Sequence, residues 1–138
     1  MYRSLLENAC IVSAINLDKI KEFSDLKIDE VVFAGGASKG ELWCQILADV
    51  TGCRVKIPKV TEATALGTAM VAGIGAGIYS DISGAVDRLV SWDRVYTPDL
   101  ANHEKYTDIR VRWQKIYDKE LKLVDEGLTE SMWKAPGI

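Results

Sequence analysis

A short strand, a pair of glycines and an amphipathic helix follow one another directly between residues 30 and 52. This order limits the fold more than any other feature of the chain. The run 30–34 reads Glu-Val-Val-Phe-Ala, which is rich in the β-branched and aromatic residues that favour a buried strand. Gly35 and Gly36 end that strand in a tight loop. The apolar stripe of a helix then runs to Gly52, a residue type that commonly stops helices.

The start of this helix carries the pattern of a capping box. Ser38 stands three residues before Glu41, so the Ser38 hydroxyl could accept a hydrogen bond from the Glu41 amide while the Glu41 carboxylate reaches back. We therefore interpret Ser38 as the N-cap of the helix. The segment as a whole predicts the strand, turn and helix of an α/β fold.

A second strand follows the helix. Val55 and Ile57 alternate with Arg54 and Lys56 until Pro58 ends the run, which is typical of a strand at or near the edge of a sheet. Two strands joined by a helix predict a parallel pair with a right-handed crossover. Because sheets usually contain more strands than this, we expect the chain to be part of a larger α/β domain whose other strands lie upstream.

The rest of the chain is predicted to be mainly helical. Helices are expected at about 5–20, from 61 or 62 through a small-residue segment that ends near 79, at 81–90 and at 102–124, with an extended connector at 91–98. We interpret the small-residue segment as a buried helix. Its Gly67 and Gly73 would allow another backbone to approach closely. The sequence thus predicts a helix-rich chain with one short parallel strand pair.

Composition and charge exclude several kinds of protein. With 138 residues, 48% hydrophobic and 27% charged, the chain has the balance of a globular domain with one core. Its net charge of −3, with lysines and arginines spread among acidic residues, offers no basic surface to a nucleic acid. The longest apolar stretch, 63–79, is rich in alanine and glycine and falls short of the roughly 20 strongly apolar residues of a membrane span.

The cysteines point to a reducing compartment. Cys10, Cys44 and Cys53 form no Cys-x-x-Cys pair, and the sequence contains a single histidine. A zinc site or a disulfide framework needs more ligands or an even set of cysteines. We therefore expect reduced thiols and a cytoplasmic protein.

Gly35 and Gly36 have the surroundings of a nucleotide-contacting turn. Glycines lack a Cβ and let a ligand approach the backbone closely, and the free amides at the start of the next helix favour an anionic or polar ligand. The spacing matches neither a Walker A loop nor a Gly-x-Gly-x-x-Gly motif. A tight turn that leads into a helix explains the same residues equally well. The pattern by itself leaves both interpretations open.

Two longer runs resemble the FGGY family of carbohydrate kinases. The run 33–52 is similar to the family pattern of Gly-Gly, a small residue, Ser and Lys, followed by Trp, Gln and Ala-Asp. The run 62–69 is similar to the family's Glu-Ala-x-Ala-Leu-Gly-x-Ala. The resemblance extends over nearly the whole chain. Residues 5–9 and 133–138 look most like the branch of the family that acts on the quorum-sensing signal autoinducer-2.

The resemblance implies an α/β fold that is the C-terminal part of an actin-like, ribonuclease-H-like ATPase domain. Residues 1–98 would form its nucleotide-facing part, and residues 99–138 a C-terminal helix and tail of the same partial domain. In such kinases the glycine turn borders ATP. Carried over by position, the ATP-binding residues are Gly35, Gly36, Ala37, Ser38, Lys39 and Gly40.

Some of these six residues can be explained by roles other than ATP binding. Ser38 also fits the capping role described above, which we favour over a phosphate contact. Lys39 fits a solvated lysine as well as a ligand contact. Ala37 and Gly40 stand where other members often have a third glycine or an asparagine. This departure favours contacts from the backbone over contacts from side chains.

Phosphoryl transfer needs more than this chain contains. A base at the acceptor hydroxyl, Mg²⁺ ligands and a clamp on the γ-phosphate are required, and the resemblance assigns them to upstream segments. We therefore expect no catalytic and no metal-binding residue here, with ATP and Mg²⁺ as cofactors of the longer kinase. A sugar-like acceptor would be bound mainly by the upstream part. A pentulose or glycerol kinase and a non-catalytic interaction module are the alternatives, and a homo-oligomer or a regulatory protein is left open as a partner.

Overall fold

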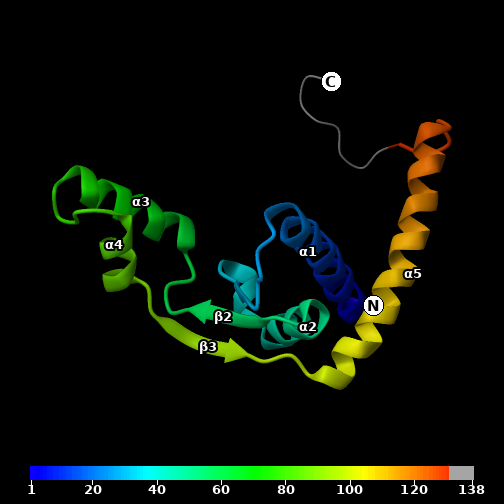
Figure 1. The fold of residues 1–138 in the computed structure, drawn as a ribbon, viewed down its shortest axis with the longest axis horizontal. Coiled ribbons are helices and arrows are strands. Elements are labelled where there is room, and N and C mark those ends of the chain that lie inside the picture. The colour runs from blue at the N-terminus through cyan, green and yellow to red at the C-terminus, as the bar shows by residue number, and fades with distance from the viewer. Residues whose placement is uncertain (131–138) are drawn as a thin grey trace.

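The computed structural model describes residues 1–130. The elements are α1 (Tyr2–Ser24), β1 (Glu30–Val32), a 3₁₀ turn η1 (Gly36–Lys39), α2 (Glu41–Thr51), β2 (Arg54–Pro58), α3 (Ala63–Gly75), α4 (Ile82–Leu89), β3 (Trp92–Tyr96) and α5 (Leu100–Asp125). Figure 1 shows α3 and α4 at one end of the molecule and α5 at the other, with α1, α2 and the sheet between them. The segment 133–138, which resembles the autoinducer-2 branch, lies outside the described residues.

Among residues 1–130 the sheet has three strands, in the order β1-β2-β3. β1 and β2 are parallel, with Val31 opposite Val55, so the predicted parallel pair is confirmed. β3 is antiparallel to β2, with Tyr96 opposite Val55. Among the described residues β2 lies between β1 and β3, one strand in from the edge, which agrees with the predicted position at or near the edge. The expected extended connector at 91–98 contains a strand, β3, that the sequence did not predict.

The alternating pattern of β2 reflects the different surroundings of its two faces. Val55 and Ile57 are fully buried in the core with α2. Arg54 and Lys56 lie on the opposite face, where they form ion pairs with Glu30 of β1 at 3.1 and 3.0 Å. Within the described residues this face of the sheet is largely open. A central strand with one open face shows the same alternation of apolar and polar residues as an edge strand.

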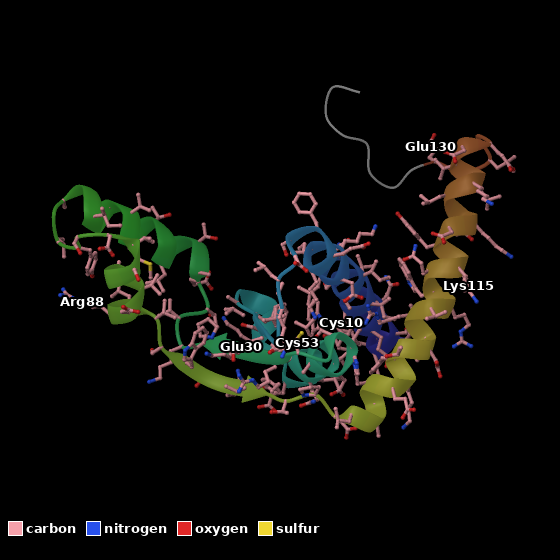
Figure 2. The ribbon with its side chains drawn as sticks, viewed as in Figure 1. Cys10, Glu30, Cys53, Arg88, Lys115 and Glu130 are labelled. Carbon is pink, nitrogen blue, oxygen red and sulfur yellow. The ribbon has the colours of Figure 1, made fainter. Side chains whose placement is uncertain are left out.

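The hydrophobic core lies between α1, α2 and the sheet. Its buried members are Leu6, Cys10, Ile11 and Ala14 of α1, Cys44, Ile46, Leu47, Ala48 and Val50 of α2, Val55 and Ile57 of β2, and Tyr106 of α5. Fully burying one such aliphatic side chain contributes about 1.5–3 kcal/mol. All three cysteines are free thiols and are buried. Figure 2 shows Cys10 and Cys53 where the helices and the sheet meet, whereas Lys115 lies on α5 and Glu130 lies beyond the C-terminal end of that helix.

The buried carboxylate of Asp49 joins α5 to α2. It is 4% exposed and accepts hydrogen bonds from the Asp99 amide at 2.9 Å, from Asn102 Nδ2 at 3.2 Å and from Gln45 Nε2 at 2.7 Å. His103 Nδ1 lies 2.8 Å from the Asp49 carbonyl oxygen. Because a carbonyl oxygen only accepts, this nitrogen carries the hydrogen. These bonds hold the first turn of α5 against the end of α2. The contact with the Asp49 carbonyl gives the single histidine of the sequence a structural role.

The small-residue helix α3 is more exposed than predicted. Met70 and Gly73 are its only buried residues, so the prediction of a buried helix is wrong for the described part of the chain. The Tyr79 ring packs on Gly73, where an added Cβ would lie 2.6 Å from Cε2 of that ring. A close approach at Gly73 is therefore confirmed, although the partner is a side chain and not a backbone. Among residues 1–130, no helix has the length and apolarity that crossing a membrane requires.

Candidate functional site

The predicted ATP-binding residues lie in the turn that links β1 to α2. Gly35 has φ 87° and ψ −175°, a combination that is essentially confined to glycine. A Cβ on Gly35 or Gly36 would meet no atom of the described chain within 4 Å, chain neighbours aside. The backbone conformation therefore requires glycine at position 35. At position 36 neither crowding nor a positive φ requires it, and the backbone there faces open space.

Ser38 shapes the turn from within. Its side chain is fully buried, and its hydroxyl donates to the carbonyl oxygen of Gly35 at 2.7 Å. The N-cap of α2 is Gly40, and no side chain caps this helix. The predicted capping box is therefore wrong, because η1 takes the place of the first helical turn and draws Ser38 inward. The Glu41 carboxylate pairs at 3.4 Å with an arginine of β3 instead.

The other predicted residues are more accessible. Gly36, Lys39 and Gly40 are exposed, and Gly35 and Ala37 are half-buried. None of the salt bridges among residues 1–130 involves Lys39. The turn thus presents a stretch of exposed backbone and one lysine to the space in front of it.

The loop after β2 lies against this turn, a contact that sequence reasoning missed. The Gly35 amide donates to the Thr61 carbonyl at 2.8 Å, just before α3 begins. Both loops follow the carboxyl ends of parallel strands, where open α/β sheets bind their ligands. That rule, applied to the predicted parallel pair, was the signal that could have placed residues 59–62 beside the site.

The loops that lead into α2 and α3 both lie at this edge of the sheet. In the described chain no side chain caps the first turn of α2 or of α3, and the first amides of a helix have no carbonyl partner within it. Glu62 is the N-cap residue of α3. Free amides and the positive ends of two helix dipoles favour a ligand with phosphate or hydroxyl oxygens.

The described residues offer backbone groups that could bind a ligand at this site. Within residues 1–130, no group of three His, Cys, Asp or Glu side chains comes together to hold a metal ion. The Cys44 thiol donates to the Ser38 carbonyl at 3.3 Å, and burial raises its pKa. A buried thiol with a raised pKa is a poor nucleophile near neutral pH. Cys44 is therefore a poor candidate for a reactive group beside the turn.

Residues 1–76, which contain β1, the glycine turn, α2, β2 and α3, match the FGGY family of carbohydrate kinases, C-terminal domain. The chain belongs to this family. The resemblance indicated by the runs 33–52 and 62–69 is thereby confirmed.

Relatives of this FGGY chain include several autoinducer-2 kinases. That of Escherichia coli (strain K12) is 56% identical over 138 residues, and those of Klebsiella pneumoniae and Yersinia enterocolitica are 54% and 52% identical. Each match covers 100% of this chain and 26% of the relative. The chain therefore spans about a quarter of the length of these curated relatives.

Solved structures of FGGY kinases share the fold. The xylulose kinase from Rhodospirillum rubrum superposes with a TM-score of 0.69 at 23% identity, over 86% of this chain and 24% of that one. The Plasmodium falciparum glycerol kinase with ADP gives a TM-score of 0.68 at 22% identity, over 85% and 23%. The prediction of an actin-like ATPase fold with a short parallel strand pair is thus confirmed.

Proposed function

We propose that this chain supplies the nucleotide-facing part of an ATP-dependent sugar kinase. The observation that carries the proposal is the open glycine turn at the carboxyl ends of two parallel strands, in a chain of the FGGY family. In this arrangement Gly36, Ala37 and Gly40 contribute backbone that ATP can approach, and Lys39 contributes a positive charge. Ser38 holds the turn in shape from inside and makes no direct contact.

The proposal includes ATP and Mg²⁺ as cofactors of the longer kinase. The turn fits a nucleotide because it combines exposed backbone with the uncapped start of α2 and adjoins the loop that leads into the uncapped start of α3. Residues 1–130 contain no acidic cluster for the metal, so we assign the Mg²⁺ ligands and the base to other segments of the protein. Mg²⁺ supplies charge neutralisation on the transferred phosphate. The 138-residue chain alone is therefore expected to release no ADP in response to any acceptor.

Autoinducer-2 is the acceptor we propose. The support is the 56% identity to an autoinducer-2 kinase across the whole chain. A pentulose or glycerol kinase is the alternative, because a xylulose kinase and a glycerol kinase share the fold. Their identities of 23% and 22% are much lower, which favours autoinducer-2.

An acceptor panel on the full-length protein tests this proposal. ADP release would be measured with autoinducer-2, xylulose and glycerol at matched ATP and Mg²⁺. We expect kcat/KM for autoinducer-2 to exceed the others by about a hundredfold or more, as polar recognition of one acceptor allows. A higher value for xylulose or glycerol would reassign the acceptor. A folded protein that neither binds ATP nor phosphorylates any of the three would remove the kinase proposal.

A non-catalytic interaction module is the second candidate. The observation in its favour is the apolar surface on the outer half of α5, where Ile116 is 55% exposed and Leu121 is 44% exposed. Light scattering of the chain with and without ATP separates the two. A monomer that binds ATP supports the kinase, whereas an oligomer without affinity for ATP supports the module.

We also propose that the protein works in the cytoplasm. Cys10, Cys44 and Cys53 are buried free thiols, which suits a reducing compartment. Fractionation of cells that express the full-length protein checks this directly, and recovery from an oxidising compartment would contradict it.

A further inference from the structure

The carbonyl groups of the glycine turn are held on its inner side. The Gly35 carbonyl accepts from the Ser38 amide at 3.2 Å and from the Ser38 hydroxyl at 2.7 Å. The Ala37 carbonyl accepts from the Gly40 amide at 3.1 Å. The C=O and N–H of one planar trans peptide group point in opposite directions. The amide of Gly36 therefore points away from the buried Ser38 hydroxyl, toward the exposed side of the turn.

The Ser38 carbonyl has a different partner, the thiol of Cys44 in the first turn of α2. The sulfur lies 3.3 Å from this oxygen, and the thiol is the donor because a carbonyl only accepts. Burial raises the pKa of the Cys44 thiol, so the sulfur keeps this hydrogen near neutral pH. Among residues 1–130, no backbone amide donates to the Ser38 carbonyl. The thiol thus ties η1 to α2.

Both ends of this bond are shielded from water. Ser38 and Cys44 are each 0% exposed. A buried carbonyl that loses its donor bears a desolvation penalty, and a rotation of the peptide group between residues 38 and 39 toward water relieves it. Such a rotation moves the Ser38 backbone and draws its hydroxyl away from the Gly35 carbonyl. The direction of the Gly36 amide therefore depends on Cys44, although the buried thiol does not reach the space in front of the turn.

We propose that Cys44 is a positioning residue for ATP. Its thiol acts through the Ser38 carbonyl and holds the turn so that the Gly36 amide faces the nucleotide. This inference rests on the proposed function of the turn as part of the ATP site. Cys44 itself touches neither ATP nor the acceptor, so its role lies in ATP affinity and not in the transfer step.

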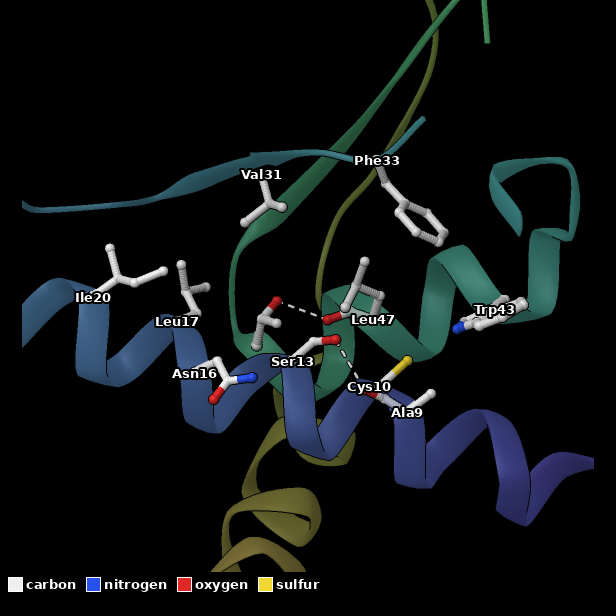
Figure 3. Close-up of a pocket in the computed structure, with 11 residues that line it drawn as sticks. Ala9, Cys10, Ser13, Asn16, Leu17, Ile20, Val31, Phe33, Trp43 and Leu47 are labelled. Carbon is white, nitrogen blue, oxygen red and sulfur yellow. Dashed lines mark hydrogen bonds between the residues drawn. The ribbon is translucent and has the colours of Figure 1, made fainter. Parts of the chain in front are cut away.

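The other two buried thiols provide matched controls. Cys53 is 2% exposed and donates to the Ile28 carbonyl at 3.4 Å, so it makes the same kind of bond at the opposite, amino-terminal end of β2. Cys10 is 1% exposed and belongs to the same core cluster as Cys44. Figure 3 shows Cys10 on α1 pointing toward α2, beside Trp43. Cys53→Ala therefore controls for the loss of a thiol–carbonyl bond, and Cys10→Ala for the loss of a buried sulfur.

The KM for ATP of the full-length protein tests the proposal. We expect Cys44→Ala to raise it about three- to tenfold, the range that the loss of one hydrogen bond gives. The kcat and the KM for the acceptor should stay within about twofold. Cys44→Ser keeps a donor and should restore most of the affinity, and the Cys10 and Cys53 controls should change the KM for ATP by less than about twofold. Equal rises in all three alanine variants, or no recovery in Cys44→Ser, would overturn the proposal.

The amide NMR signals of the glycines report on the turn without ATP. In the full-length protein with isotope-labelled glycines, Cys44→Ala should shift the signals of Gly35 and Gly36, whereas Cys53→Ala should leave them in place. Unchanged signals in Cys44→Ala would show that the thiol does not hold the turn. Cys44→Val is a second variant that fills the space of the sulfur and lacks its hydrogen. If Cys44→Ala does not fold, a folded Cys44→Val protein with unaltered affinity for ATP would contradict the proposal.

A comparison with Gly36→Val separates the role of Cys44 from the nucleotide site itself. If Gly36→Val weakens ATP binding and Cys44→Ala does not, the positioning role fails while the nucleotide site stands. If neither variant changes the KM for ATP, the nucleotide site fails and the role of Cys44 fails with it.

Discussion

Gly36→Val in the full-length kinase should weaken ATP binding while the protein stays folded. Position 36 has open space where a Cβ would lie, and its φ is not positive. Valine is therefore compatible with the turn itself. Its branched side chain would nevertheless fill the space in front of the turn, where the proposed nucleotide lies. One substitution thus separates contact with ATP from folding.

The expected loss follows from the backbone contacts at this turn. Displacing a phosphate oxygen from one backbone amide forfeits a hydrogen bond to a charged group, which is worth about 1.5–3 kcal/mol. This energy corresponds to a loss of about 10- to 150-fold in ATP affinity. The cost to folding should stay below about 1 kcal/mol, because no packed neighbour has to move.

The assay combines the ATP dependence of turnover with thermal melting. Gly75→Val is the matched control, because an added Cβ at this end of α3 also meets open space. It should change neither the KM for ATP nor the melting temperature. Gly35→Val is the opposite control, since its φ of 87° is strained for valine and should lower the melting temperature whether or not ATP is present. The KM for the acceptor should change by less than about twofold in Gly36→Val.

Two results would refute this reasoning. A folded Gly36→Val protein with the KM for ATP of the unmodified enzyme would leave Gly36 as a turn residue without a nucleotide role. Equal losses of ATP affinity in Gly36→Val and Gly75→Val would show that the effect is not local to the turn.

Three further predictions concern buried polar groups. Ser38→Ala should lower the free energy of unfolding by about 1–2 kcal/mol, because the carbonyl of Gly35 loses the hydroxyl donor and keeps only the amide of residue 38; unchanged stability with weaker ATP binding would make Ser38 a ligand. Asp49→Ala should cost about 3 kcal/mol in urea denaturation, since it leaves several donors without an acceptor. The exposed Asp87→Ala on α4 is its control, and equal losses in both would contradict the role of Asp49. Burial raises the pKa of the Cys10 thiol to about 11, so at pH 8 Cys10 should resist iodoacetamide in the folded protein and react after unfolding; rapid alkylation of the folded protein would argue against this burial.

Local sequence patterns were sufficient to predict the segment that leads into the proposed site. The β-branched run at 30–34, the paired glycines and the apolar stripe up to Gly52 predicted β1, the turn and α2 in their observed order. Gly52 ends α2 in a left-handed conformation, as expected. These features depend on residues that are close in sequence, so secondary-structure propensity and hydrophobic periodicity predict them directly.

The capping box failed because a short motif has more than one geometry. Ser38 and Glu41 have the right spacing, yet the chain makes a 3₁₀ turn before α2 begins. This turn places the Ser38 hydroxyl inside, next to the carbonyl of Gly35. The pattern contains no information about which side of the turn faces the core, and burial decided the role of Ser38.

The sequence by itself determined the family, the parallel strand pair and the glycines of the proposed ATP site. Each of these features can be identified from a contiguous run of residues. Tertiary structure alone decided that β2 lies between β1 and β3, that Trp92–Tyr96 is a strand, and that the Thr61 loop lies against Gly35. Each of these depends on segments far apart in the chain. Strand pairing and the meeting of two loops follow from packing against a common core, and a pattern confined to one segment cannot specify its partner.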